Sequence, residues 1–432
     1  MKILKTKHNQ ILLLLQFLFC FFIINNTIAG FFIPSLVFIV INSFLLFIKG
    51  IKKRIDIIDF YFIFISFYVV FGLLLFNHYT FQETFLKISL LPFIIPVEQE
   101  LFNINIVYAI SLLVFSIILF DVKSDFRVKN KIETNKSNKI FFIVIIILTA
   151  ILGVISYKYK DASYIQYLRN ATWYEKGLVS YSFLILLSII SCLNLKYPYN
   201  KKILHSFFCL LPIMFILSLG NRIFVLVLLF ALLLNLQKRG LKIGLGQIAG
   251  GSILMVLVLL VAVKRNGVSV SFEYNVFTAL MEFIAPNISA HYFINNPLGF
   301  NSLFPSSIDF FTQLLPERLV PLNNIENMRS FYKSNGIEID PIGGQFLFGQ
   351  LFFYFRSFAF VVLLLFSVFI LKMKRKLLFN TISSIEIVLP LILMYSSRFY
   401  IVGIPRNILY SLFLFFIIKS VIESIRKPDL NI

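Results

Sequence analysis

Arginine is the residue type whose positions in this chain could do chemistry. Arg222 stands in Leu-Gly-Asn-Arg-Ile between two apolar runs, and Arg398 and Arg406 flank a short turn between two others. Arg356 lies inside an apolar run, so either it faces the protein interior or a wet cavity, or the membrane span begins later, near Ser357. A guanidinium presents its N–H donors as a rigid fork that binds phosphate bidentately without a metal ion. These positions therefore indicate a phosphate or pyrophosphate site.

Two segments place basic side chains beside turns. Gly220 and Asn221 are expected to form a sharp turn that directs both of their backbone N–H groups, and the Arg222 guanidinium, outward at a helix N-terminus. Lys264 and Arg265 end another apolar run, where the chain becomes polar. The competing interpretation of these cations is a snorkelling or anchoring side chain at a membrane interface.

Acid–base chemistry has fewer candidates. Asp340 precedes the Gly-rich turn Pro341-Ile342-Gly343-Gly344, and a carboxylate on such a turn could serve as a general base. Glu273 and Glu282 fall on opposite sides of an expected helix and cannot form a carboxylate pair. His291 is isolated, and a lone histidine is more often structural than catalytic.

The composition defines the class of protein that carries these residues. Hydrophobic residues make up 59% of the chain, well above the roughly 45–50% of soluble domains. The apolar runs have the length of membrane-crossing helices and lack the alternation of barrel strands.

The sequence predicts an all-α polytopic membrane protein with about twelve transmembrane helices. The predicted spans are 11–28, 31–48, 57–76, 104–120, 140–157, 178–194, 203–219, 223–236, 246–263, 350–371, 381–397 and 407–418. The segment 88–97 is too short to span and is interpreted as re-entrant or interfacial.

The basic residues predict the orientation. With the N-terminus inside, every short basic loop falls on the cytoplasmic side, and these segments hold 26 of the 40 Lys and Arg residues. This asymmetry is what the positive-inside rule expects. The net charge of +20 therefore indicates topology, and no nucleic-acid partner is expected. Both termini are predicted to be cytoplasmic.

The same topology divides the chain into three parts. Residues 1–263 form a bundle of about nine spans, residues 264–345 a large external loop, and residues 346–432 the last three spans with a cytoplasmic tail. Within the loop, residues 272–283 place apolar side chains on one helical face and predict an amphipathic helix on the membrane surface.

Several classes of function are disfavoured. Cys20, Cys192 and Cys209 all lie in apolar runs, which supports neither a disulfide framework nor a thiolate metal site. The sequence contains no Walker A loop, no GxGxxG after a strand and no HExxH helix, which argues against an ATP-driven pump, a Rossmann enzyme and a zinc protease. Neither a metal nor a cofactor is expected.

The chain resembles the Wzy-type polymerases of O-antigen and capsular polysaccharide repeat units. The resemblance covers essentially the whole length and rests mainly on the predicted topology, with both ends inside and a large late periplasmic loop. The supporting motifs are Gly220-Asn221-Arg222 between paired spans, Lys264-Arg265-Asn266 at the entry to the loop and Pro341-Ile342-Gly343-Gly344 at its exit.

The resemblance implies a GT-C-like fold related to the O-antigen ligases, placed in the bacterial inner (cytoplasmic) membrane. It implies a metal-independent glycosyltransferase that moves the growing glycan from undecaprenyl pyrophosphate onto the non-reducing end of a newly flipped, lipid-linked repeat unit. The implied partners are the undecaprenyl-pyrophosphate-linked donor and acceptor, membrane lipid and a Wzz-like chain-length regulator.

The resemblance also assigns roles to residues of this chain. Arginines are expected to stabilise the charge on the leaving pyrophosphate, and an acid–base group to accept the proton of the acceptor hydroxyl. The substrate-binding candidates are Arg222 and Arg265 on the pyrophosphate, Arg398 or Arg406 completing the clamp, and Arg356 and Lys264. The candidate bases, in order, are Asp340, Glu273 and His291.

Two alternatives remain open at the level of sequence. A Wzx-like flippase of lipid-linked oligosaccharides would also have about twelve spans, but it should lack the long loop at 264–345. An O-antigen ligase, which joins finished chain to a lipid A core, is poorly separated from a polymerase by sequence. A secondary transporter is less favoured, since no repeat symmetry is evident.

Overall fold

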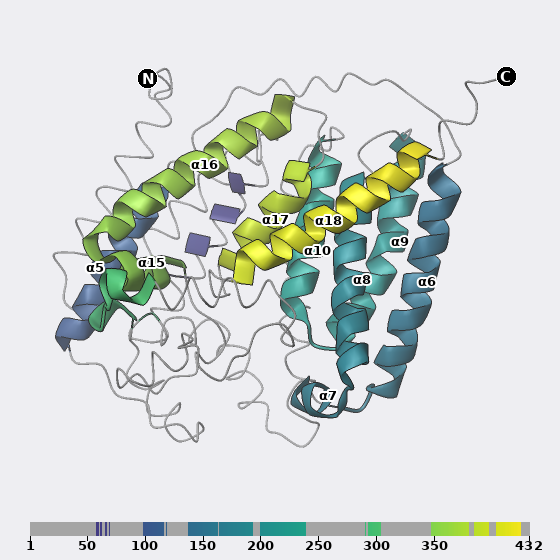
Figure 1. Ribbon diagram of the computed structural model, residues 1–432, viewed down its shortest axis with the longest axis horizontal. Coiled ribbons are helices and arrows are strands. Elements are labelled where there is room, and N and C mark those ends of the chain that lie inside the picture. Colours follow the sequence, from purple (N-terminus) through teal and green to yellow (C-terminus); the bar gives the residue numbers. More distant parts are fainter. Residues whose placement is uncertain are drawn as a thin grey trace. The chain divides into compact units, whose positions relative to one another are not determined.

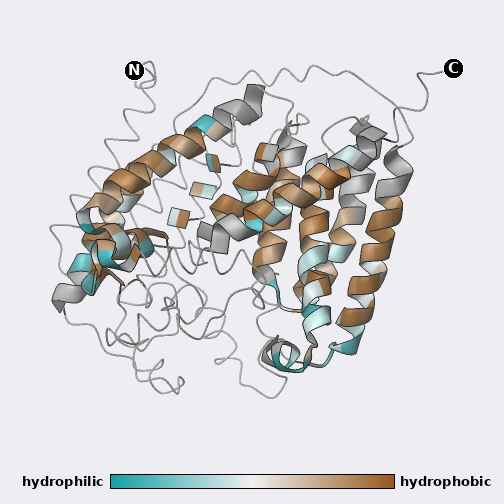
Figure 2. Cartoon of the chain, in the orientation of Figure 1, coloured by the Kyte–Doolittle hydropathy of each residue, from teal (hydrophilic) through white to brown (hydrophobic). Residues whose placement is uncertain are grey.

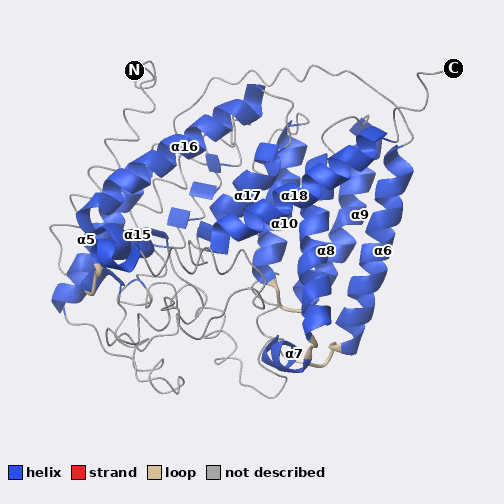
Figure 3. Cartoon of the chain, in the orientation of Figure 1, coloured by secondary structure: helices blue, strands red, loops and turns tan. Residues whose placement is uncertain are grey.

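The structure, a computed structural model, describes separate segments of the chain. The described residues are 58–59, 61–62, 65–66, 69, 98–115, 118, 137–162, 164–192, 199–238, 290, 293–303, 347–379, 384–396 and 403–424. All regular structure in these segments is helical, and they contain no strand (Figure 3). The predicted all-α class is confirmed for this part of the chain.

Packing divides the chain into two compact units. The first unit comprises residues 1–123, 280–375 and 395–406, and the second comprises residues 124–279, 376–394 and 407–432. Each unit is therefore assembled from segments that are distant in the sequence. The predicted division at 263 and 345 into bundle, loop and C-terminal spans follows topology and not packing, and it stays a prediction.

The second unit is built around long helices that lie side by side (Figure 1). They are α6 (Ser137–Lys158), α8 (Trp173–Cys192), α9 (Tyr199–Ser218) and α10 (Arg222–Lys238), with the short α7 (Tyr164–Asn170) between α6 and α8. Helix α6 packs on α8 and α9, and α10 packs on the same two helices. The apolar runs predicted at 140–157, 178–194, 203–219 and 223–236 thus form helices at the expected places.

Small side chains line the contact between α6 and α9. A Cβ atom added at Gly153 would lie 3.5 Å from the ring of Phe215. One turn further along, the hydroxyl oxygens of Ser156 and Ser218 are 2.5 Å apart. Small residues and hydroxyl pairs at a helix interface are typical of helices that associate in an apolar surrounding.

The first unit contains α5 (Glu98–Phe115), α15 (Leu347–Phe355) and most of α16 (Ala359–Phe379). Phe115 lies at the centre of its aromatic packing. The Phe115 ring centroid is 6.1 Å from that of Phe62, 5.9 Å from that of Phe348 and 6.3 Å from that of Phe366. This one ring therefore joins α5 to the helical residues near 62, to α15 and to α16.

Length and composition indicate association with a membrane. Two described helices are long and apolar enough to cross one, Trp173–Ser191 in α8 and Leu347–Met373 through α15 and α16. Helices α6, α16 and α18 (Gly403–Ser424) are brown along their middles in Figure 2 and expose large apolar side chains. Val154 of α6, for example, is 71% exposed.

Buried hydroxyl groups are satisfied within their own helices. Ser188 of α8 and Ser367 of α16 are fully buried, and each donates to the carbonyl oxygen four residues earlier in its own helix, at 2.9 Å and 2.7 Å. Such back-bonding satisfies a polar side chain where no water reaches it.

Several predicted elements lie outside the described residues. They are the spans at 11–28, 31–48 and 246–263, the segment 88–97 and the amphipathic helix at 272–283. The predicted span 381–397 coincides with α17 (Ser384–Ser396), and the predicted span 407–418 falls within α18.

Candidate functional site at the α15–α16 break

The run predicted as one span at 350–371 is interrupted. Helix α15 ends at Phe355, the 3-10 turn η8 covers Arg356–Phe358, and α16 begins at Ala359. Arg356 has φ +48, a left-handed conformation that destabilises a non-Gly residue by roughly 1–2 kcal/mol. Backbone outliers of this kind concentrate at functional sites. The Arg356 side chain is exposed and not buried in the protein, while the start of the membrane span stays a prediction.

The Arg356 guanidinium contacts a part of the predicted large loop. The described residues of this part are 290 and 293–303, and they are called the loop segment below. Arg356 Nη2 donates to the carbonyl oxygen of Pro297 at 3.2 Å. Gly299, the first residue of η5 (Gly299–Ser302), lies against the same side chain, because a Cβ atom there would be 3.1 Å from Arg356 Nε. Gly299 also has φ +66, which favours glycine. Arg356 makes no ion pair with another described residue, so its charge is uncompensated in this part of the structure.

Packing beneath Arg356 holds the loop segment in place. Phe293, Phe353 and Tyr354 form a buried cluster, with the rings of Phe293 and Phe353 4.9 Å apart. Ala290 lies directly on α15, since a Cβ atom added at Gly349 would be only 2.9 Å from the Ala290 Cβ. The loop segment is thus fastened to α15 by apolar contacts and by one close approach that requires glycine.

Helix α5 also contacts the loop segment. Asn103 Nδ2 donates to Asn295 Oδ1 at 3.1 Å, which joins α5 to the loop segment. Further along α5, Asn105 is 2% exposed, and its Oδ1 accepts no hydrogen bond from the part of the chain that the structure describes. Gln350 of α15 is also buried, at 1% exposed. The Asn105 and Gln350 amides are therefore inside the packing of the first unit, and the exposed charge of the site belongs to Arg356.

Arg222 is the first residue of α10 and follows the predicted tight turn, in which Gly220 has φ +83. The N–H groups of the turn are used within it. Gly220 N–H donates to the Leu217 carbonyl oxygen at 2.8 Å, and Asn221 N–H to that of Ile216 at 3.3 Å. This Schellman pattern satisfies the last carbonyl groups of α9. The expectation that both N–H groups point at an anion is therefore wrong, while a role for the Arg222 side chain stays a prediction.

The other predicted site residues are placed only in part. Arg406 lies in the first turn of α18. The remaining candidates, Asp340, Glu273, His291, Lys264, Arg265 and Arg398, lie outside the described residues. The arrangement of these cations and bases around a substrate stays a prediction.

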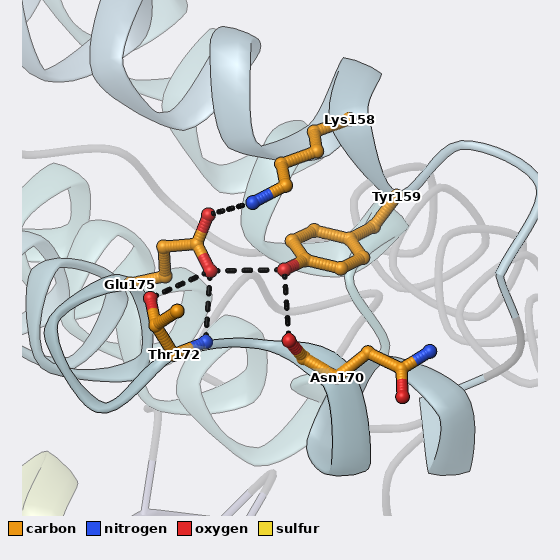
Figure 4. A network of polar contacts seen from close by, with 5 residues as sticks. All are labelled: Lys158, Tyr159, Asn170, Thr172 and Glu175. Atoms are coloured by element: carbon orange, nitrogen blue, oxygen red, sulfur yellow. Dashed lines mark hydrogen bonds and ion pairs between the residues drawn. The ribbon is translucent and has the colours of Figure 1, made fainter.

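A second polar cluster, which the sequence reasoning missed, lies where α6, α7 and α8 meet (Figure 4). Glu175, in the first turn of α8, accepts hydrogen bonds from Lys158 Nζ at 2.6 Å and from the Tyr159 hydroxyl at 2.9 Å. Thr172 donates its backbone N–H and its hydroxyl to the same carboxylate, each at 2.8 Å. The Tyr159 hydroxyl also donates to the Asn170 carbonyl oxygen at 3.4 Å. The Glu175 side chain is 9% exposed.

These contacts set the ionisation of the cluster, which precedes the predicted span 178–194. The hydrogen bond from Lys158 lowers the pKa of the Glu175 carboxyl to about 2, with support from Thr172 and Tyr159 and against the effect of burial. The hydrogen bond to Glu175 raises the pKa of Lys158. Burial, followed by the hydrogen bond to Glu175, raises the pKa of Tyr159. Lys158 and Glu175 are therefore an ion pair at neutral pH.

Part of this cluster has a sequence signal. Thr172-Trp173-Tyr174-Glu175 has the S/T-x-x-E spacing of a capping box, in which the carboxylate reaches back to the N-cap N–H. That signal could have located the start of α8 at Trp173, ahead of the predicted start at 178. The partnership with Lys158 has no local signal, because it joins two different helices.

The described residues thus define a class: an all-helical protein with two helices able to cross a membrane, and a loop segment fastened over a helix break. They include no group of three or more His, Cys, Asp or Glu side chains that could hold a metal ion. The metal-independent chemistry expected from the sequence stays a prediction. No protein-family model, curated protein or solved structure shows significant similarity to the chain.

Proposed function

We propose that the chain is a polymerase of surface-polysaccharide repeat units in the bacterial inner membrane. It would have about twelve spans, cytoplasmic termini and a catalytic face in the periplasm. The distribution of basic residues, the late polar segment 264–345 and the resemblance to Wzy-type polymerases support this proposal. The two helices long enough to cross a membrane agree with it.

The observation that carries the proposal is the position of Arg356. An arginine with an uncompensated charge is held in a strained conformation at a helix break, and a segment of the large loop contacts it through Pro297 and Gly299. One N–H of the guanidinium binds the loop, which leaves the rest of the fork for a ligand. A pyrophosphate matches that fork in charge and geometry.

The proposed reaction is a glycosyl transfer. A hydroxyl at the non-reducing end of the acceptor repeat unit attacks the anomeric carbon of the donor glycan. The new glycosidic C–O bond forms as the C–O bond to undecaprenyl pyrophosphate breaks, and the hydroxyl proton passes to a base, for which Asp340, Glu273 and His291 are the candidates. Arginine N–H groups stabilise the charge that develops on the departing pyrophosphate.

The test is complementation of a deletion strain, with surface polysaccharide separated by size on a gel. Wild type and Lys372→Ala, a matched change at an exposed cation of α16, should restore a ladder. Arg356→Ala should leave one repeat unit on the lipid core at normal membrane levels. If deletion removes even the single-unit band, the protein acts before or at attachment, and the flippase or ligase interpretation replaces the polymerase.

A further inference from the structure

The α6–α8 corner, residues 157–181, gathers exposed aromatic side chains at one end of the second unit. Trp173, the only tryptophan of the chain, is 84% exposed. Tyr157 is 72% exposed and Tyr174 51%, and Tyr181, two turns further along α8, is 60% exposed. The three large rings at the end of the helix bundle need an apolar partner on one side and water on the other, because tyrosine and tryptophan carry both kinds of surface.

An apolar surface leads up to this corner. From residue 142 on, where the side chains of α6 are described, its exposed residues recur at helical spacing along one face, and before the corner they are apolar: Ile143, Ile146, Ile147, Ala150 and Val154. Tyr157 follows on the same face, and the exposed Lys160 comes one turn later. Figure 2 shows the matching change from brown to pale and teal toward the α7 end of α6. The polarity of this face therefore changes at the corner.

The corner also carries uncompensated positive charge. Lys158 is paired with Glu175. The remaining basic residues of this segment are Lys160, Arg169 and Lys176, and its one other acidic residue is Asp161. None of these three cations makes an ion pair with another described residue. Lys160 Nζ lies 4.9 Å from the centroid of the Tyr157 ring, at the end of the apolar face.

We propose that the α6–α8 corner is a membrane-interface site that binds the phosphate groups of anionic phospholipids. The apolar face of α6 would lie in the hydrocarbon, Tyr157, Trp173 and Tyr174 at the headgroup level, and Lys160, Arg169 and Lys176 among the phosphates. Tryptophan and tyrosine collect at this level of a bilayer, and lysine and arginine stems extend along apolar surface toward it.

The ion pair at Glu175 gives the corner its rigidity. The carboxylate ties the end of α6 to the start of α8 and, through Thr172, to the chain that follows α7. Because Lys158 is engaged in that bond, Glu175 does not cancel the charge of Lys160, Arg169 or Lys176. The surface offered to the headgroups is thus preformed and positive.

The single tryptophan makes the test direct, because the tryptophan fluorescence of the whole protein reports on Trp173 alone. The full-length protein is placed in nanodiscs of phosphatidylcholine, with or without phosphatidylglycerol. A nitroxide quencher is attached near the headgroup or near the end of the acyl chain, on either lipid. The variants are Lys160→Gln and, as a matched change elsewhere in the chain, Lys372→Gln.

The site predicts stronger quenching by the shallow label than by the deep one. It also predicts that labelled phosphatidylglycerol quenches more strongly than labelled phosphatidylcholine at equal fraction, because each basic residue at the surface adds about fivefold to anionic-lipid binding. Lys160→Gln should reduce that preference, and Lys372→Gln should leave it unchanged.

Three results would overturn the inference. Stronger quenching by the deep label would place Trp173 in the hydrocarbon. Absence of quenching by every lipid would place the corner in water, free for a protein partner. Equal quenching by the two labelled lipids, or an equal effect of the two lysine changes, would reduce the corner to an aromatic anchor without phosphate recognition. None of these results bears on glycosyl transfer, so the polymerase proposal is tested separately.

Discussion

At the scale of single residues, Arg356 combines a strained backbone with an exposed charge. The contact with Pro297 and the packing of Gly299 against its side chain hold the guanidinium beside the loop segment. A residue that served stability alone would not occupy the left-handed region, since glycine fits there without strain. The conformation of Arg356 is therefore best explained by a task of its side chain.

This explanation predicts opposite effects on stability and activity. Arg356→Gly should have a free energy of unfolding roughly 1 kcal/mol higher than Arg356→Ala, because glycine relieves the strain at φ +48. It should therefore unfold at a higher temperature. Both variants should lose chain elongation, since neither carries a guanidinium. Thermal unfolding in detergent and the polysaccharide ladder measure the two effects. An Arg356→Gly variant that elongates like wild type would contradict the role given to the side chain.

Glu175 carries the residue-scale prediction for pH. Its folded pKa of about 2 lies below the ordinary value of 4.5, so its contribution to stability is complete above about pH 4.5 and is lost as the pH falls toward 2. Glu175→Gln should lower the free energy of unfolding at neutral pH by about 1–3 kcal/mol and flatten its acid dependence.

The control for Glu175 is its exposed partner. Lys158→Gln should lower the free energy of unfolding by less than Glu175→Gln does, because a solvated ion pair contributes little and the Lys158 side chain is 55% exposed. Chemical denaturation across a pH series measures both variants. Equal losses would show that the Thr172 and Tyr159 hydrogen bonds contribute nothing beyond the ion pair.

At the scale of elements, one glycine joins the loop segment to α15. Alanine normally stabilises a helix relative to glycine by about 1 kcal/mol. At Gly349 the new methyl group would meet Ala290 at 2.9 Å, and its backbone Cα at 3.1 Å. Gly349→Ala should therefore reduce both stability and chain elongation. At Gly153 the nearest atom is 3.5 Å away, so Gly153→Ala should be neutral or stabilising. A stabilised, active Gly349→Ala variant would show that the segment is not held at this contact.

The elements also show how far the sequence could predict the fold. The helices α6, α8, α9 and α10 were foreseen, because each contains an apolar run of membrane-crossing length. The break at Arg356–Phe358 was not, because the residues around it are apolar on both sides. The packing of residues 290 and 293–303 onto α5 and α15 depends on contacts such as Asn103 to Asn295, far apart in the sequence, and no local pattern encodes them.

For the candidate site, the sequence could indicate the arginine but not the residues that contact it. Arg356 could be singled out because a charge inside an apolar run is unusual. Its partners in the loop could not, since a backbone carbonyl at Pro297 and a glycine at Gly299 have no side-chain signature. At Arg222 the turn was foreseen and its hydrogen bonding was not, because Gly220 N–H and Asn221 N–H end α9 instead of facing a ligand.

At the scale of the whole molecule, the distribution of basic residues and the exposed apolar surface both agree with a chain embedded in a membrane. The basic segments between predicted spans favour one orientation in the membrane, and the described helices expose apolar side chains as lipid-facing helices do. The proposed orientation would place the polar segment 264–345 on the external side, and its residue Pro297 contacts the break that carries Arg356. Polymerisation at that face is the central claim.

The most direct test of that claim is polymerisation by the purified protein in liposomes. The substrate is the lipid-linked single repeat unit that a deletion strain accumulates, supplied with a chelator and without nucleotide sugars. The account predicts a ladder of longer lipid-linked glycans with release of undecaprenyl pyrophosphate, and it predicts that Arg356→Ala makes none while Lys372→Ala makes the full ladder. Single units that remain unchanged with wild-type protein, or that merely cross the bilayer, would contradict it.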